Sequence, residues 1–142
     1  RQMCIRDSFT TIQDIGRFGY KNIGVPVSGS MDQTSAKLAN LLLGNDESSA
    51  VLEMTLVGPT LEFMNDTYIS ITGADMNPSL NKQKVLQNKP LFVNKGDILY
   101  LSHSSNGMRS YLGIKGGFNS EKKLGSKSFY RGITKREKLI NF

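Results

Sequence analysis

The chain has 142 residues, of which 38% are hydrophobic and 21% are charged. This length suits one domain with its own core, because domains commonly hold about 100–150 residues. No apolar run approaches the roughly 20 residues that a membrane-spanning helix requires, so we expect a soluble protein without a membrane partner. The lone Cys4 cannot form an internal disulfide, which favours a reducing, cytoplasmic setting.

The net charge of +6 is concentrated near one end of the chain. Residues 115–142 hold 8 Lys and Arg residues against Glu121 and Glu137, and the remainder of the chain is balanced. Between Lys122 and Lys138 the aromatic side chains are Phe129 and Tyr130, so stacking on bases is poorly supported. We expect a solvated basic face and no nucleic-acid partner, with a phosphate-binding role as the alternative.

Residues 1–8 show neither a helical nor a strand period, and we expect them to be a non-native leader. A short strand is expected over 9–13. It is followed by a loop that several glycines and a proline interrupt, which indicates a close approach of the backbone to another group. These residues are Gly16, Gly19, Gly24, Pro26 and Gly29.

A single amphipathic helix is expected over 33–43. Asp32 is a favourable N-cap, and apolar residues from Ala36 to Leu43 then recur at helical spacing. Gly44 and Asn45 supply a C-terminal stop signal.

The remaining pattern is typical of antiparallel strands. Short β-branched or alternating runs occur over 51–56, 60–64, 68–72, 79–85, 90–93, 98–103 and 109–114, and turn signals separate them. The pattern predicts a mainly β fold, either a small barrel or a sandwich, with one helix.

The densest group of polar residues lies on the glycine-flanked loops of the first quarter of the chain. It comprises Gln13, Asp14, Arg17, Ser28 and Asp32. The Arg17 guanidinium suits a carboxylate, and either aspartate could orient it or accept a proton. The structural alternatives are an Asp14–Arg17 salt bridge and a capping role for Asp32. Backbone amides freed by glycine could also bind a carbonyl or phosphate oxygen.

No familiar catalytic pattern is present. His103 is the one histidine and Cys4 lies in the suspected leader, so neither a Ser-His-Asp triad nor a metal site is expected. We interpret His103 as a turn residue. Alternation favours a solvent-facing Glu53, and the alternative is a partly buried carboxylate with a raised pKa. Glycine- and serine-rich stretches at 116–118 and 124–128 could supply further amides.

Several motifs in order resemble one known family. They are TTIQDIGRFGY (10–20), GVPVSGSMD (24–32), ANLLLGN (39–45), LEMTLVGPTLEF (52–63), ITGAD (71–75), GMRSYLGIKGGF (107–118) and LGSKS (124–128). Together they resemble the carboxyltransferase-domain, subdomain C and D family, also called the allophanate hydrolase subunit 2 family, whose bacterial members include the C subunit of 5-oxoprolinase.

The resemblance implies a cyclophilin-like β-barrel, the first of two in a longer protein. On that basis we expect a barrel domain over 9–118 and a basic connecting segment over 119–142 that begins the second half. The implied activity is ATP-dependent hydrolysis of 5-oxoproline to L-glutamate together with the A and B subunits of 5-oxoprolinase, the assembled complex using ATP. The alternatives are the carboxyltransferase part of a biotin-dependent urea carboxylase and a non-catalytic regulatory partner of the B subunit.

The resemblance also implies site residues. The family's Gln-Asp and Arg fall on Gln13, Asp14 and Arg17, and we expect Asp14, Arg17 and Asp32 to be catalytic. Its Pro-x-Ser-Gly-x-Met-Asp motif falls on 26–32, and substrate-binding residues are expected at Gln13, Ser28, Gly29, Met31, Asn40, Asn45, Glu53, Arg109 and Tyr111. The family's usual Ser-Thr reads Ser128-Phe129 here, which puts the hydroxyl contacts of that loop in doubt.

Overall fold

The computed structural model describes residues 2–5, 10–131 and 139–141, with side chains described over 10–131. The strands are β1 (Gln2–Ile5), β2 (Thr10–Gln13), β3 (Val51–Thr55), β4 (Thr60–Phe63), β5 (Thr67–Asp75), β6 (Ser79–Leu80), β7 (Gln83–Lys84), β8 (Leu91–Val93), β9 (Ile98–Tyr100), β10 (Asn106–Ile114) and β11 (Leu139–Asn141). One 3-10 turn, η1 (Lys21–Ile23), and one α-helix, α1 (Gln33–Leu42), complete these elements.

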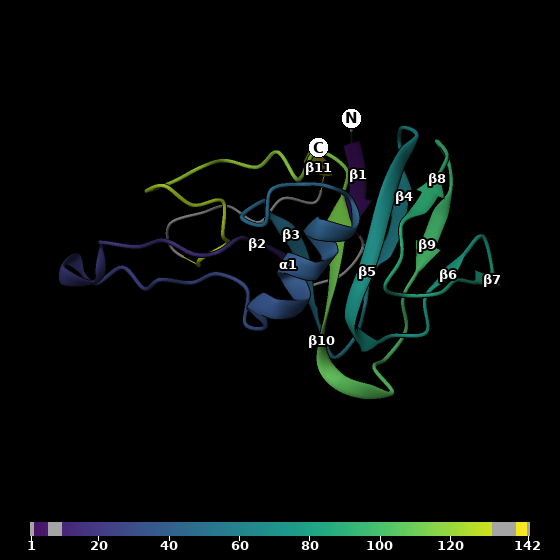
Figure 1. The fold of residues 1–142 in the computed structure, drawn as a ribbon, viewed down its shortest axis with the longest axis horizontal. Helices are drawn as coiled ribbons and strands as arrows, with labels where there is room; N and C mark the ends of the chain where they lie inside the picture. The colour runs from purple at the N-terminus through teal and green to yellow at the C-terminus, as the bar shows by residue number, and fades with distance from the viewer. Residues whose placement is uncertain (1, 6–9, 132–138, 142) are drawn as a thin grey trace.

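The strands form two antiparallel sheets, and α1 lies against one of them (Figure 1). One sheet has the order β11-β1-β4-β9-β6-β7 and the other has the order β2-β3-β10-β5-β8. The predicted mainly β class with one helix is confirmed. Across the described residues the two sheets are not closed into a single barrel, so the chain is an open two-sheet version of the expected fold.

The core lies between the two sheets because alternate strand residues point to opposite faces. On β3, Leu52 and Met54 are fully buried in the inter-sheet cluster, while Val51 belongs to a smaller cluster with α1. The inter-sheet cluster also contains Leu61, Phe63, Ile69, Ile71, Met76, Val93, Leu99, Leu101, Leu112, Ile114 and Phe118.

Because of the same alternation, the other face of β5 packs against α1. Ser70 and Thr72 point away from the inter-sheet core, and their hydroxyls donate to the α1 carbonyls of Ala39 (2.6 Å) and Ser35 (2.7 Å). A Cβ on Gly113 of β10 would lie 2.9 Å from the Ala39 carbonyl oxygen, so glycine permits this close helix–sheet contact.

Most predicted elements are found with small changes in their ends. The helix ends at Leu42, one residue early, with Leu43 as its C-cap, and β5 and β10 are longer than expected. The single strand expected over 79–85 is wrong: it is the hairpin β6–β7. Asn81 and Lys82 at its turn both have positive φ, 49° and 69°, which is typical of a tight two-residue hairpin turn.

Residues 2–5 form β1, which pairs with β4 and β11. This pairing does not test the expected non-native leader at 1–8, which stays a prediction, and 6–8 lie outside the described residues. Residues 119–131 return to the first loops, where the Phe129 amide donates to the Ile12 carbonyl. The expected connecting segment at 119–142 also stays a prediction, because 132–138 and 142 are not described.

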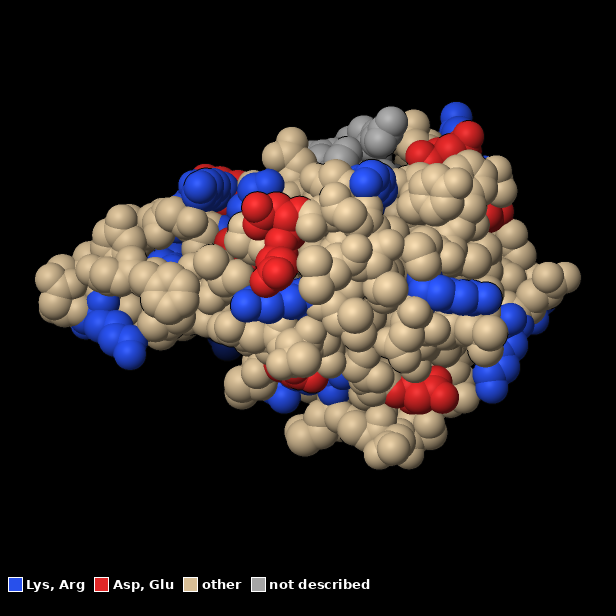
Figure 2. Space-filling view, viewed as in Figure 1, with Lys and Arg blue, Asp and Glu red and all other residues tan. Residues whose placement is uncertain are grey.

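Residues 14–32 form an arm that extends away from the two sheets, with η1 at its far end (Figure 1). On the face shown in Figure 2, basic and acidic side chains are interspersed with other residues. No helix in the described part of the chain is long and apolar enough to cross a membrane.

Candidate functional site

The residues that the sequence marks as a site fall into two places. We call the first the loop junction: it joins residues 13–17 and 27–30 of the arm to 123–128. We call the second the groove: it lies between the start of α1 and the adjoining ends of β5 and β10. Its lining residues are Met31, Asp32, Ser35, Gly73, Ala74, Asn106, Gly107, Met108 and Arg109.

The carboxylate of Asp14 holds the loop junction together. Its Oδ1 accepts from the Gly16 amide (2.8 Å) and from the hydroxyls of Ser126 and Ser128 (both 2.6 Å). Its Oδ2 accepts from the Lys127 amide (2.7 Å). Burial alone would raise the pKa of Asp14, but these four hydrogen bonds favour the charged form and hold the pKa below its ordinary value. A carboxylate so occupied is a weak proton acceptor.

Two glycines allow the strands of the arm to cross closely. Gly16 and Gly29 have φ of 102° and 93°, and a Cβ on Gly29 would lie 2.9 Å from backbone atoms of Gly16. Next to this crossing, the Arg17 amide donates to the Val27 carbonyl (2.6 Å). Ser28 also has a positive φ, 55°, in the same turn. The two strands of the arm are therefore in direct backbone contact at this crossing.

Arg17 is buried in the loop junction, with only 1% of its surface exposed. Its Nη2 donates to the Ser128 carbonyl (2.8 Å) and its Nε to the Lys123 carbonyl (3.1 Å). The structure shows no Asp14–Arg17 ion pair, and Nη1 has no hydrogen-bond partner among the described residues. Burying a cation without a carboxylate is costly, and the two carbonyl acceptors offset part of that cost.

Three expected substrate-binding residues lie outside the groove and hydrogen-bond to other parts of the chain. Gln13 is buried, and its Nε2 donates to the Thr11 hydroxyl (3.1 Å). Asn40 and Asn45 join the exit of α1 to the rest of the fold. The Asn40 Nδ2 donates to the Ser49 carbonyl (2.8 Å), and the Asn45 Nδ2 donates to the carbonyl at the end of β10 (2.7 Å). None of the three lines the groove.

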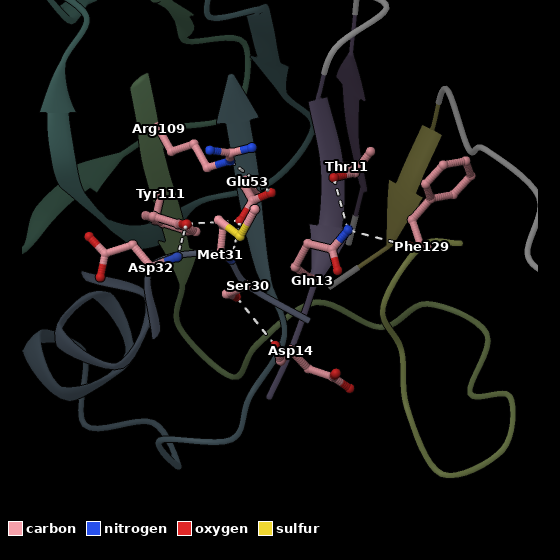
Figure 3. A network of polar contacts seen from close by, with 10 residues as sticks. All are labelled: Thr11, Gln13, Asp14, Ser30, Met31, Asp32, Glu53, Arg109, Tyr111 and Phe129. Atoms are coloured by element: carbon pink, nitrogen blue, oxygen red, sulfur yellow. Dashed lines mark hydrogen bonds and ion pairs between the residues drawn. The ribbon is translucent and has the colours of Figure 1, made fainter. Parts of the chain in front are cut away.

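Beneath the groove, a hydrogen-bond network joins the buried side chains of Tyr111 and Glu53 to the backbone of Met31 and Asp32 (Figure 3). The Tyr111 hydroxyl donates to Glu53 Oε2 and accepts from the Asp32 amide, both at 2.8 Å. The same Glu53 oxygen accepts from the Met31 amide (2.8 Å). Burial and the neighbouring Glu53 carboxylate raise the pKa of Tyr111 well above its ordinary value, so the phenol stays protonated.

The favoured prediction of a solvent-facing Glu53 is wrong, because only 8% of the residue is exposed. Glu53 does alternate with Leu52 and Met54, but the face it points to is covered by the start of α1 rather than by solvent. Its Oε1 lies 3.7 Å from the Nε of Arg109. That distance allows electrostatic attraction but is too long for a hydrogen bond.

The groove itself has a volume of about 470 Å³. Asp32 and Arg109 are the charged side chains among its lining residues. Asp32 caps α1, as one of the two sequence interpretations predicted: Oδ1 accepts from the Ser35 amide (3.0 Å) and Oδ2 from the Ser35 hydroxyl (2.6 Å). These hydrogen bonds lower the pKa of Asp32, so its carboxylate is charged at neutral pH.

Sequence reasoning missed several groove residues, including Gly73, Asn106 and Met108. The signal that could have found them is the register of the β5–β10 strand pair, which places Asn106 opposite Asp75. His103 is exposed and forms an isolated bridge with Val57, outside both places. Among the described residues, no cluster of three His, Cys, Asp or Glu side chains could hold a metal ion.

Comparison with known proteins identifies the family of this chain. The family model for the carboxyltransferase domain, subdomain A and B, matches residues 23–134. The carboxyltransferase-domain resemblance is therefore confirmed, with the subdomains being A and B where the motifs had suggested C and D.

Individual relatives cover nearly the whole chain. It is 45% identical to the urea amidolyase of Lachancea kluyveri over 87% of its length and 38% identical to the C subunit of Escherichia coli 5-oxoprolinase over 83%. It spans only 7% and 38% of those two proteins. The crystal structure of K. lactis urea amidolyase superposes on 99% of the chain, and on 9% of that protein, with a TM-score of 0.90 at 38% identity.

Proposed function

The chain belongs to the carboxyltransferase-domain family, subdomain A and B, and from this membership we propose that it is part of an enzyme acting on the carbonyl group of a small amide. The proposed reaction is the ATP-dependent hydrolysis of 5-oxoproline to L-glutamate, in which water adds across the lactam C–N bond. The proposed partners are the A and B subunits of 5-oxoprolinase, because a C subunit of that enzyme is among the relatives. A cytoplasmic location is part of the proposal.

The observation that carries this proposal is the composition of the groove. A guanidinium from Arg109 and a carboxylate from Asp32 line one shallow cavity of about 470 Å³, and a buried network fixes the backbone below them. Small-molecule sites commonly combine such a cavity with a few convergent polar groups. A cyclic amide with donor, acceptor and charged edges suits that set.

The three expected catalytic residues contribute in different ways under this proposal. Asp32 lines the groove and can contact substrate directly. Asp14 and Arg17 lie in the loop junction with their hydrogen bonds directed into the chain, so their proposed role is to position the loop that leads to the groove.

ATP is proposed to bind a partner subunit rather than this chain. A phosphate cradle needs backbone amides that are free to donate. In the arm, the amides of Gly16, Arg17 and Ser30 instead donate to the Asp14 carboxylate, the Val27 carbonyl and the Asp14 carbonyl. These three amides of the glycine loops are therefore not available to a polyphosphate.

A second candidate is the carboxyltransferase reaction of a biotin-dependent urea carboxylase. Sequence identity favours it, since the urea amidolyase relative is 45% identical and the 5-oxoprolinase relative 38% identical. The sequence contains no Met-Lys-Met, so biotin would be carried by another segment. The charged pair in the groove favours the first candidate, because 5-oxoproline carries a carboxylate that can pair with Arg109 and urea itself does not.

The test is glutamate release from 5-oxoproline by the complete native protein mixed with the A and B subunits, with and without ATP. Asp32→Asn, Asp14→Asn and Arg17→Ala are assayed beside the wild type. Activity that requires this protein and falls most with Asp32→Asn would support the proposal. Absence of glutamate release from folded components, together with biotin-dependent carboxylation of urea, would establish the second candidate instead.

A further inference from the structure

The groove contains one cation whose hydrogen-bonding capacity is unused. The Nε of Arg109 is buried, with no hydrogen bond in the described part of the chain, and its contact with Glu53 at 3.7 Å is electrostatic only. No described residue accepts a hydrogen bond from Nη1 or Nη2 either. A guanidinium presents these two nitrogens as a planar fork that matches the two oxygens of a carboxylate.

The same groove is also lined by a hydrogen-bond acceptor, the carboxylate of Asp32. The Asp32 Oδ1 accepts from the Ser35 amide and Oδ2 from the Ser35 hydroxyl, and the Thr34 amide also interacts with this carboxylate. Each carboxylate oxygen can accept about two hydrogen bonds, so acceptor positions remain for a ligand N–H. In contrast, the amides of Met31 and Asp32 already donate to Glu53 and Tyr111, so the start of the helix offers no anion site of its own there.

Glu53 and Tyr111, which lie beneath the groove, hold Arg109 and the backbone of Asp32 in place. Glu53 attracts Arg109 through one carboxylate oxygen and binds the Met31 amide through the other. Tyr111 connects Glu53 to the backbone of Asp32. A site whose polar groups are fixed before binding loses less conformational entropy when the ligand arrives.

We infer that the groove binds a small amide that carries a carboxylate. Arg109 takes the carboxylate through its Nη fork, and Asp32 accepts the amide N–H. This inference rests on the proposed function in one respect, because 5-oxoproline carries both groups on one ring. The groove then acts as the specificity determinant that separates 5-oxoproline from 2-pyrrolidinone, the same lactam without the carboxylate, and from urea.

The test is calorimetric titration of the complete native protein with 5-oxoproline, 2-pyrrolidinone and urea, without ATP. We expect 5-oxoproline to bind most tightly, and Arg109→Gln to weaken it by about tenfold or more through loss of a charge-assisted pair. Arg109→Lys keeps the charge without the fork and should be intermediate. Asp32→Asn keeps a cap for α1 and should weaken 5-oxoproline and 2-pyrrolidinone alike.

Lys89→Gln is the matched control, because it removes one exposed positive charge outside the groove. The affinity of this variant for 5-oxoproline should equal that of the wild type. Melting temperatures of all variants establish that they are folded. Equal affinity of the wild type and folded Arg109→Gln for 5-oxoproline would overturn the groove assignment, as would equal binding of 5-oxoproline and 2-pyrrolidinone. ATP-dependent glutamate release that persists in the Arg109 variants would leave the proposed function intact, so the two failures are distinguishable.

Discussion

The phenol of Tyr111 on β10 donates a 2.8 Å hydrogen bond to the carboxylate of Glu53, its direct cross-strand partner on β3. Register thus places the two side chains together on the face that α1 covers. Both also bind the backbone just before the helix, at Met31 and Asp32. The sheet therefore fixes where the helix begins, and with it the wall of the groove.

Removing the Tyr111 hydroxyl should weaken this connection. Tyr111→Phe leaves the Asp32 amide without its acceptor and the buried Glu53 carboxylate with one donor fewer. An unsatisfied buried polar group costs about 1–3 kcal/mol, so we expect a lower free energy of unfolding by that amount. Chemical denaturation of the complete protein measures it.

Tyr68→Phe is the control for this prediction. Tyr68 is 49% exposed on β5 and its ring packs against Phe92, a contact that phenylalanine retains. Its unfolding free energy should match that of the wild type. If Tyr111→Phe were no less stable than Tyr68→Phe, the network beneath the groove would have no part in stability.

Asp14→Asn should destabilise the loop junction in a pH-dependent way. The folded-state pKa of Asp14 lies below its ordinary value of 3.8, so the unfolded chain takes up this proton first. The carboxylate therefore contributes stability above the ordinary pKa and loses it as the pH falls through the lowered value. We expect the difference in melting temperature between wild type and Asp14→Asn to be largest at neutral pH and to shrink below about pH 4.

Asp66→Asn serves as the comparison, because Asp66 is exposed and accepts one backbone hydrogen bond, from Lys95. Its effect should be smaller at neutral pH. A difference in melting temperature between wild type and Asp14→Asn that stays constant from neutral pH to about pH 3 would show that the charged form of Asp14 does not stabilise the folded state.

Local patterns in the sequence predicted most of the fold. The helix was found because its cap, its apolar spacing and its Gly44 stop all agree. The β6–β7 hairpin was missed because its turn residues, Asn81 and Lys82, lie between runs too short to show alternation. The arrangement of strands into two open sheets depends on contacts between distant residues, which no local period encodes.

The candidate site was predicted only in part, because the sequence does not show what covers each face of a strand. The residue types around the groove were identified, but Glu53 was expected in solvent. Alternation along a strand shows which residues share a face, but it does not show whether a helix covers that face. Asn40 and Asn45 were marked by a motif, and a motif does not distinguish a residue kept for binding from one kept for folding. The hydrogen bonds of Asn40 and Asn45 within the chain show a structural role, and their expected part in substrate binding stays a prediction.

Asn40→Ala tests that distinction directly. Asn40 is 1% exposed and donates to the Ser49 carbonyl, so its removal should lower the free energy of unfolding by about 1–3 kcal/mol. The KM for 5-oxoproline in the assembled complex should stay unchanged below the melting temperature. Asn22→Ala, exposed in η1, is the control and should change neither quantity. A several-fold rise in KM with unchanged stability would return Asn40 to the substrate site.

Gly29→Ala and Gly19→Ala separate backbone strain from steric contact in the arm. Both glycines have positive φ, 93° and 89°, so alanine is strained at either position by about 1–2 kcal/mol. At Gly19 a Cβ meets nothing within 4 Å, whereas at Gly29 it lies 2.9 Å from the backbone of Gly16. The crossing must then open, so Gly29→Ala should lose more stability than Gly19→Ala and should also weaken 5-oxoproline binding, since the same segment leads to Met31 and Asp32. Equal melting temperatures and equal affinities for the two variants would contradict the close crossing of the arm and its role in placing the groove.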